Sequence, residues 1–65
     1  MFNRKALIDF MEEKKISTSS LAKELGVTEG AIRHITSGLK QPSLVLAVRI
    51  SEKMGRTVDS LIVKN

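Results

Sequence analysis

Apolar residues recur along this chain at intervals of three and four positions, the spacing of one face of a helix. The first such stretch runs from about Asn3 to Lys14, with Leu7, Phe10 and Met11 on its apolar face. Asn3 is a suitable N-terminal cap, because its side-chain oxygen accepts a hydrogen bond from an otherwise unpaired N–H. No run of alternating β-branched or aromatic residues predicts a strand, and no Asn-Gly or Asp-Gly pair marks a hairpin. The pattern predicts an all-α fold.

A second and a third helix are predicted between residues 17 and 38. The second begins after Ser17 or Thr18 and ends at Gly26, since glycine enters the left-handed conformation of a helix end without steric cost. Thr28 caps the third helix, which ends at residues 37–38. A near-perpendicular pair with a short turn, the helix-turn-helix arrangement, is indicated by Leu21, Ala22, Leu25, Gly26, Val27, Ile32 and Ile35. An ordinary helical hairpin with similar use of alanine and glycine is the alternative.

Two more helices are predicted after a loop over residues 39–42. Ser43 caps a helix over residues 44–54, and Thr57 caps a short last helix over residues 58–63. The residues expected to face inward are Leu44, Ala47, Val48, Ile50 and Met54 in the fourth helix and Leu61 and Ile62 in the fifth. The prediction is therefore a bundle of five helices joined by short loops.

Length and composition limit what this bundle can do. We expect one domain, residues 1–65, which buries only about 60% of the surface of its unfolded chain and has no room for a deep substrate cleft. Only two residues are aromatic, so the core is expected to be aliphatic. The net charge of +4 favours a polyanionic partner such as nucleic acid, although many small proteins are as basic for solubility alone.

Other chemistry is not expected from this composition. The absence of cysteine excludes disulfides and thiolate metal sites. Catalysis would need a nucleophile, a base and an orienting group, and the one histidine, His34, has no acidic residue three or four positions away. We predict no catalytic residue, no metal, no cofactor and no small-molecule substrate. The longest apolar run, residues 44–48, is too short to span a bilayer and no signal peptide is evident, so no membrane contact and a cytoplasmic location are expected.

The stretches ISTSSLAKELGVTEGAIRHITSGLKQPSL and AVRISEKMGRTVDSLI resemble the Cro/C1 repressor-type (XRE-like) helix-turn-helix family, over roughly residues 3–62. The resemblance implies a five-helix, lambda-repressor-like bundle that binds double-stranded DNA, most often as a repressor acting by operator occupancy. It also implies a homodimer on a palindromic operator, in the cytoplasm of a bacterial or phage-infected host cell. Relatives also serve as antitoxins. A protein-interaction module of the same fold is therefore the alternative, with Leu39 and Val45 as candidate contacts.

The third helix, over residues 28–37, is then the recognition helix, which lies in the major groove. Because Ile32 and Ile35 face inward, the residues expected to contact bases are Glu29, Gly30, Arg33 and His34. Arg33 suits guanine and Glu29 suits the amino group of cytosine. In the competing interpretation these two are solvated charges, with the acid favouring the positive start of the helix.

Phosphates are expected at the starts of the second and third helices, where free N–H groups and the positive dipole end attract anions. The residues predicted to contact phosphates are Ser17, Thr18, Ser19, Thr28, Ser37, Lys40 and Gln41. Capping alone is the alternative role for the hydroxyls. The predicted dimer interface is Leu61, Ile62 and Val63, which alternatively seal the core of one chain.

Two features depart from the family pattern. Relatives usually carry a longer polar side chain at the position of Gly30, and a glycine inside a helix costs about 0.5–1 kcal/mol relative to alanine. The small size of Gly30 either lets DNA approach the helix closely or has no role. Met11 and Thr36 replace an Arg and a Glu that pair in many relatives. Losing both leaves no unpaired charge, but it removes an Arg that often helps to position DNA.

Overall fold

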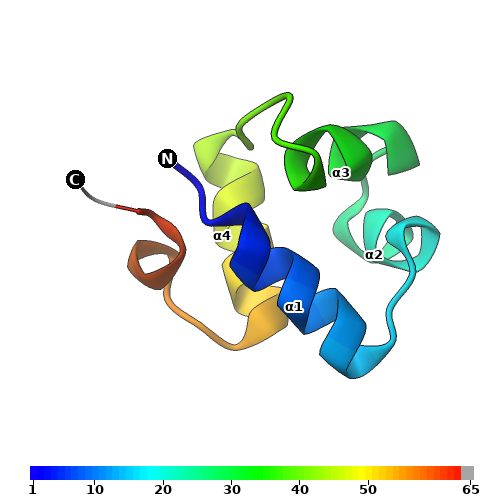
Figure 1. Ribbon diagram of the computed structural model, residues 1–65, viewed down its shortest axis with the longest axis horizontal. Coiled ribbons are helices and arrows are strands. Elements are labelled where there is room, and N and C mark those ends of the chain that lie inside the picture. The colour runs from blue at the N-terminus through cyan, green and yellow to red at the C-terminus, as the bar shows by residue number, and fades with distance from the viewer. Residues whose placement is uncertain (64–65) are drawn as a thin grey trace.

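The helices begin where a side chain accepts a hydrogen bond from the first turn. The computed structural model describes residues 1–63, which contain the four α-helices α1 (Arg4–Lys14), α2 (Thr18–Leu25), α3 (Glu29–Thr36) and α4 (Leu44–Met54) (Figure 1). The residue before each helix caps it: the side chains of Asn3, Ser17, Thr28 and Ser43 accept from the backbone N–H groups of Ala6, Ser20, Ala31 and Leu46. The predicted caps of these four helices are confirmed, with Ser17 rather than Thr18 at the start of α2.

Each α-helix ends at, or is followed by, a residue in the left-handed backbone conformation. α2 and α4 end at the predicted glycines, Gly26 and Gly55, with φ angles of 72° and 70°. α1 ends at Lys15, whose φ of 55° is uncommon for a residue with a side chain. Ser37 stays in the helical region at the end of α3, and Gly38 follows it with φ of 84°. Glycine is therefore needed at residue 38 to turn the chain away from α3.

The core takes one fully buried residue from each helix and one from the turn that follows α4: Leu7, Leu21, Ile32, Ile50 and Leu61. Phe2 is also buried, with 5% of its surface exposed, so the expectation of a purely aliphatic core is wrong. The ring reaches the core because the segment before α1 packs against the end of the described chain, a contact that helical spacing does not predict.

The buried face of α4 also differs from the prediction. Ala47, Ile50 and Ser51 are buried, and the Ser51 hydroxyl donates to the carbonyl oxygen of Val48 at 2.6 Å. Leu44 and Val48 are 73% and 36% exposed, so their predicted burial is wrong. Consecutive apolar residues cover more than one side of a helix, and their spacing does not show which side meets the core.

The predicted fifth helix is shorter and tighter than expected. Val58–Leu61 form a single 3-10 turn, η1, and Thr57 makes no capping hydrogen bond with its side chain. Ile62 then pairs with Phe2 in an antiparallel bridge, which draws the chain into an extended conformation. A helix to Val63 and a count of five helices are therefore wrong: residues 1–63 form four α-helices and this turn.

α1 and α4 lie at the centre of the molecule, with α2 and α3 on one side and η1 on the other (Figure 1). α3 packs against both α2 and α1, which cover its inner face. Within residues 1–63, no helix combines the length and the apolar character that crossing a bilayer requires.

Candidate nucleic-acid interface

The turn between α2 and α3 is built as the sequence predicts. Gly26 adopts the left-handed conformation, and the N–H of Val27 donates to the carbonyl oxygen of Ala22 at 3.0 Å. Arg49 of α4 adds a hydrogen bond from Nη1 to the carbonyl oxygen of Leu25, at 3.3 Å. α2 is also joined to α4 by an ion pair of 2.5 Å between Glu24 and Lys53. α2 is thus fixed to the body of the molecule, and α3 is fixed to α2.

The predicted base-contacting residues lie together on the outer face of α3. Ile32 and Ile35 are buried against α1 and α2, whereas Gly30, Arg33 and His34 are exposed and Glu29 is half-buried. The space above Gly30 is open, since a Cβ added there would meet no atom within 4 Å. A partner can therefore approach the backbone of α3 closely at Gly30.

An ion pair links two of these side chains. Nη2 of Arg33 donates to Oε1 of Glu29, one helical turn earlier, and 67% of the arginine side chain is exposed. The predicted roles give each of these residues its own base to contact, whereas the structure pairs the two side chains. The two side chains neutralise each other in the free protein, and the remaining N–H donors of Arg33 stay accessible.

Most of the residues predicted to contact phosphates lie at the start of α2 or at the two ends of α3. The hydroxyls of Ser17 and Thr28 accept capping hydrogen bonds, which leaves their O–H groups to donate. Thr18 and Ser19 form the first turn of α2, and Ser37 closes α3 by donating to the carbonyl oxygen of His34 at 3.2 Å. All of these residues except the half-buried Thr18 are exposed.

A shallow hollow joins the base-contacting face to the loop after α3. Its lining residues are Thr28, Gly30, Ala31, His34, Ile35, Lys40, Gln41, Pro42 and Leu46. Lys40 is exposed and makes no ion pair or side-chain hydrogen bond with any residue in 1–63. Gln41 differs, because its Oε1 accepts the N–H of Phe2 at 2.7 Å. The amide group of Gln41 still has its two N–H donors.

Met11 and Thr36, which stand where many relatives have an ion pair, lie near each other in the structure. Met11 and Thr36 line one hollow, together with Ser17 and Thr18 at the start of α2. Arg4, which is not among the predicted site residues, donates from Nη1 to the carbonyl oxygen of Thr36 at 2.8 Å. No local sequence signal joins these two residues, which lie 32 positions apart.

The three residues predicted for a dimer interface differ in accessibility. Leu61 is fully buried in the core of its own chain, and Ile62 is half-buried in the bridge to Phe2. Val63 is 45% exposed. In this conformation Leu61 seals the core, the alternative role that its sequence position allowed.

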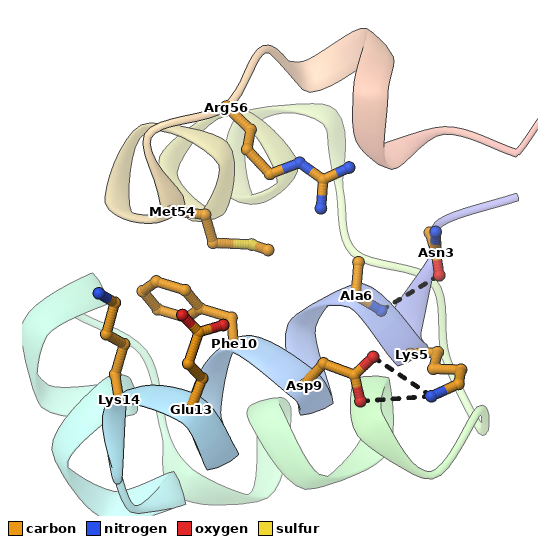
Figure 2. A pocket seen from close by; sticks show the side chains of 9 residues that line it. All are labelled: Asn3, Lys5, Ala6, Asp9, Phe10, Glu13, Lys14, Met54 and Arg56. Carbon is orange, nitrogen blue, oxygen red and sulfur yellow. Dashed lines mark hydrogen bonds and ion pairs between the residues drawn. The ribbon is translucent and has the colours of Figure 1, made fainter.

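A third hollow lies on the outer side of α1, toward the end of α4 (Figure 2). The ring of Phe10 faces Met54 there, so Phe10 is half-buried rather than part of the core. The hollow is bordered by Glu13, Lys14, Arg56 and the ion pair between Lys5 and Asp9. None of the predicted DNA-contacting residues lines it.

The fold and the exposed outer face of α3 define a helix-turn-helix protein. The model of the helix-turn-helix family of Cro/C1 (XRE-like) type matches residues 7–61, and the chain belongs to this family. Comparison with curated proteins gives no match. Family membership indicates a DNA-binding regulator whose partner is double-stranded DNA, in a family that is generally not enzymatic. Within residues 1–63, no three His, Cys, Asp or Glu residues are grouped to hold a metal ion.

Proposed function

We propose that this protein is a sequence-specific transcriptional repressor that occupies its operator and blocks access of the polymerase. The observation that carries the proposal is the outer face of α3, where Gly30, Arg33 and His34 are exposed while Ile32 and Ile35 anchor the helix. A helix held in this way enters the major groove with its N-terminal residues at the base edges.

Sequence reading is assigned to the first two turns of α3. Arg33 binds O6 and N7 of a guanine through its guanidinium, and Glu29 accepts from N4 of a neighbouring cytosine or holds Arg33 in place. His34 contacts the next base edge or a phosphate, and Gly30 lets the duplex approach the helix backbone. The ion pair between Glu29 and Arg33 supports this assignment because it places the arginine on the exposed face.

Affinity is assigned to phosphate contacts on both sides of this face. Ser17, Thr18, Ser19 and Thr28 act at the starts of α2 and α3, where hydroxyl and N–H donors are combined with the positive dipole end. Ser37, Lys40 and Gln41 act beyond the end of α3. These contacts release counterions, so we expect affinity to fall steeply as salt rises.

Selection of bound duplexes from a random pool tests the proposal directly. We expect enrichment of a palindromic site whose half-sites are about one helical turn apart. The control is Lys14→Ala, which removes an exposed cation that lines a hollow without any predicted DNA-contacting residue and should enrich the same site. No enrichment with the unmodified protein would contradict sequence-specific binding.

Pairing of two copies on the operator is part of the proposal. Ile62 and Val63 are the accessible members of the predicted interface, while Leu61 supports them from the core. Sedimentation with and without the selected duplex measures the stoichiometry. A strict monomer in both conditions would contradict the homodimer and leave DNA binding intact.

The exposed apolar residues near the start of α4 support a second candidate, a module that binds another protein. Leu39, Leu44 and Val45 are 74%, 73% and 65% exposed, and exposed apolar residues gathered in one region are typical of interaction sites. Salt separates the two candidates, because an apolar protein interface does not weaken with salt as a phosphate interface does.

A further inference from the structure

The segment before α1 connects the recognition helix to the end of the described chain. The N–H of Asn3 donates to the carbonyl oxygen of Leu61 at 2.7 Å, and Phe2 and Ile62 form the antiparallel bridge. On its other side, the N–H of Phe2 donates to Oε1 of Gln41 at 2.7 Å. This segment therefore holds the loop that follows α3.

Arg4 continues this contact to the end of α3 itself. Its Nη1 donates to the carbonyl oxygen of Thr36, one of the carbonyls that a helix end leaves without a partner in the helix. The side chain also fills the space over Gly38, where an added Cβ would lie 3.2 Å from Nε and 3.3 Å from Cζ of the arginine. Gly38 thus serves the turn and also leaves room for the arginine.

The surroundings of Arg4 suit an anion. A guanidinium has five N–H donors, and the bond to Thr36 is the one side-chain hydrogen bond that Arg4 makes within residues 1–63. The hollow beside it is lined by Met1, Phe2, Asn3, Arg4, Lys5, Ser37, Gly38, Gln41 and Val63, with no carboxylate among them. The ammonium of the neighbouring Lys5 is paired with Asp9 at 3.2 Å on the other side of α1 (Figure 2). The N-terminal ammonium of Met1 also lines the hollow and donates to the carbonyl oxygen of Val63 at 3.4 Å. Arg4 is therefore the side-chain cation next to Ser37 and Gln41 that has no carboxylate partner within residues 1–63.

We propose that Arg4 has two roles in the DNA interface: it positions the end of the recognition helix through Thr36 and binds a backbone phosphate next to Ser37 and Gln41. This inference rests on the proposed function and adds a residue to its site. The guanidinium suits both tasks, since its planar fork presents donors in more than one direction. One helix-positioning contact thereby also fixes the distance between α3 and the duplex backbone.

The test compares Arg4→Met with Lys14→Met on a mixed-sequence duplex of about 20 base pairs, two helical turns. Each variant keeps an unbranched side chain and removes one exposed cation from α1. For Arg4→Met we expect about tenfold weaker binding at low salt and a slope of log affinity against log salt that is shallower by about 0.9. Lys14→Met should keep the slope of the unmodified protein. Thermal unfolding of both variants confirms that they are folded.

The role of Arg4 in positioning the end of α3 is tested separately, by amide hydrogen exchange. The N–H groups of Leu39 and Lys40 both donate to the carbonyl oxygen of His34, which closes the end of α3. In Arg4→Met these two amides should exchange faster. Arg4→Lys should restore the salt slope, because it restores the charge, while leaving the two amides less protected, because an ammonium lacks the planar fork.

The possible failures are distinguishable. If the unmodified protein binds the duplex and Arg4→Met keeps the full salt slope, the phosphate contact is wrong and the proposed function stands. If the slope changes but the two amides keep their protection, the positioning role is wrong. If the unmodified protein shows no salt-dependent binding to the duplex, both this inference and the proposed function are overturned.

Discussion

Arg33 gives the most direct test of how α3 reads DNA. The change Arg33→Ala removes an exposed side chain that touches Glu29 and no other residue through a side-chain hydrogen bond or ion pair within residues 1–63. An exposed pair of this spacing stabilises a helix by about 0.3–0.5 kcal/mol. The total stability of a core of this size is about 3–5 kcal/mol. The variant therefore stays folded, and its melting temperature should fall by no more than about 4 °C.

The expected loss in DNA binding is much larger than the loss in folding stability. A bidentate contact between arginine and guanine contributes about 1–3 kcal/mol of discrimination, so operator affinity should fall about 5- to 150-fold. The double variant Glu29→Ala, Arg33→Ala shows which role Glu29 has. Affinity should fall further if the carboxylate accepts from N4 of a cytosine. It should recover in part if the carboxylate only holds Arg33, because without its partner the unpaired charge repels the duplex.

Fluorescence anisotropy with the selected operator and its single-base variants is the appropriate assay. Arg33→Ala should bind the operator and the variant with a changed guanine equally well, while preferences at the other positions persist. Circular dichroism on the same samples gives the folded fraction. If Arg33→Ala binds the operator as tightly as the unmodified protein, the assignment of α3 as the reading element is wrong.

Three further changes test other parts of the structure. Lys40→Ala should weaken binding to all duplexes alike and reduce the salt slope by about 0.9, measured by titration at several salt concentrations; a loss confined to the operator would contradict a phosphate role. Gly30→Ala should raise the free energy of unfolding in urea by about 0.5 kcal/mol, since the added Cβ meets no neighbour. The same variant should weaken operator binding if DNA approaches the helix closely at this position. A lower urea midpoint would show that the space above Gly30 is not open. Leu21→Ala should cost about 2–5 kcal/mol because Leu21 is fully buried, which leaves little or no folded protein by circular dichroism; a melting curve like that of the unmodified protein would contradict its place in the core.

The local parts of this fold could be predicted from the sequence, because their causes lie within a few residues. Ser17, Thr28 and Ser43 each cap a helix through a bond to an N–H three residues on, and Gly26 ends α2 by its own conformational freedom. The outward face of α3 followed in the same way, from the burial of two isoleucines at helical spacing. These features can be predicted without information about distant segments of the chain.

The features that the sequence did not predict depend on contacts between distant segments. Phe2 enters the core because it pairs with Ile62, and the same pairing ends η1. Leu44 is exposed at the start of α4, although its apolar character predicted burial. Arg4 reaches Thr36 across the space that Gly38 leaves open. Periodicity alone contains no information about such partners.

The recognition helix also explains why those distant contacts matter for function. α3 has eight residues, and an isolated helix shorter than about 12–15 residues is marginal in water. Its outer face must stay open for a ligand, so that face contributes only the weak pair of Glu29 and Arg33 to its stability. The helix must then be held by its buried isoleucines and by its two ends, through Thr28 at the start and Arg4 at the finish. On the proposed function, a contact from the first residues of the chain is therefore part of the surface that reads DNA.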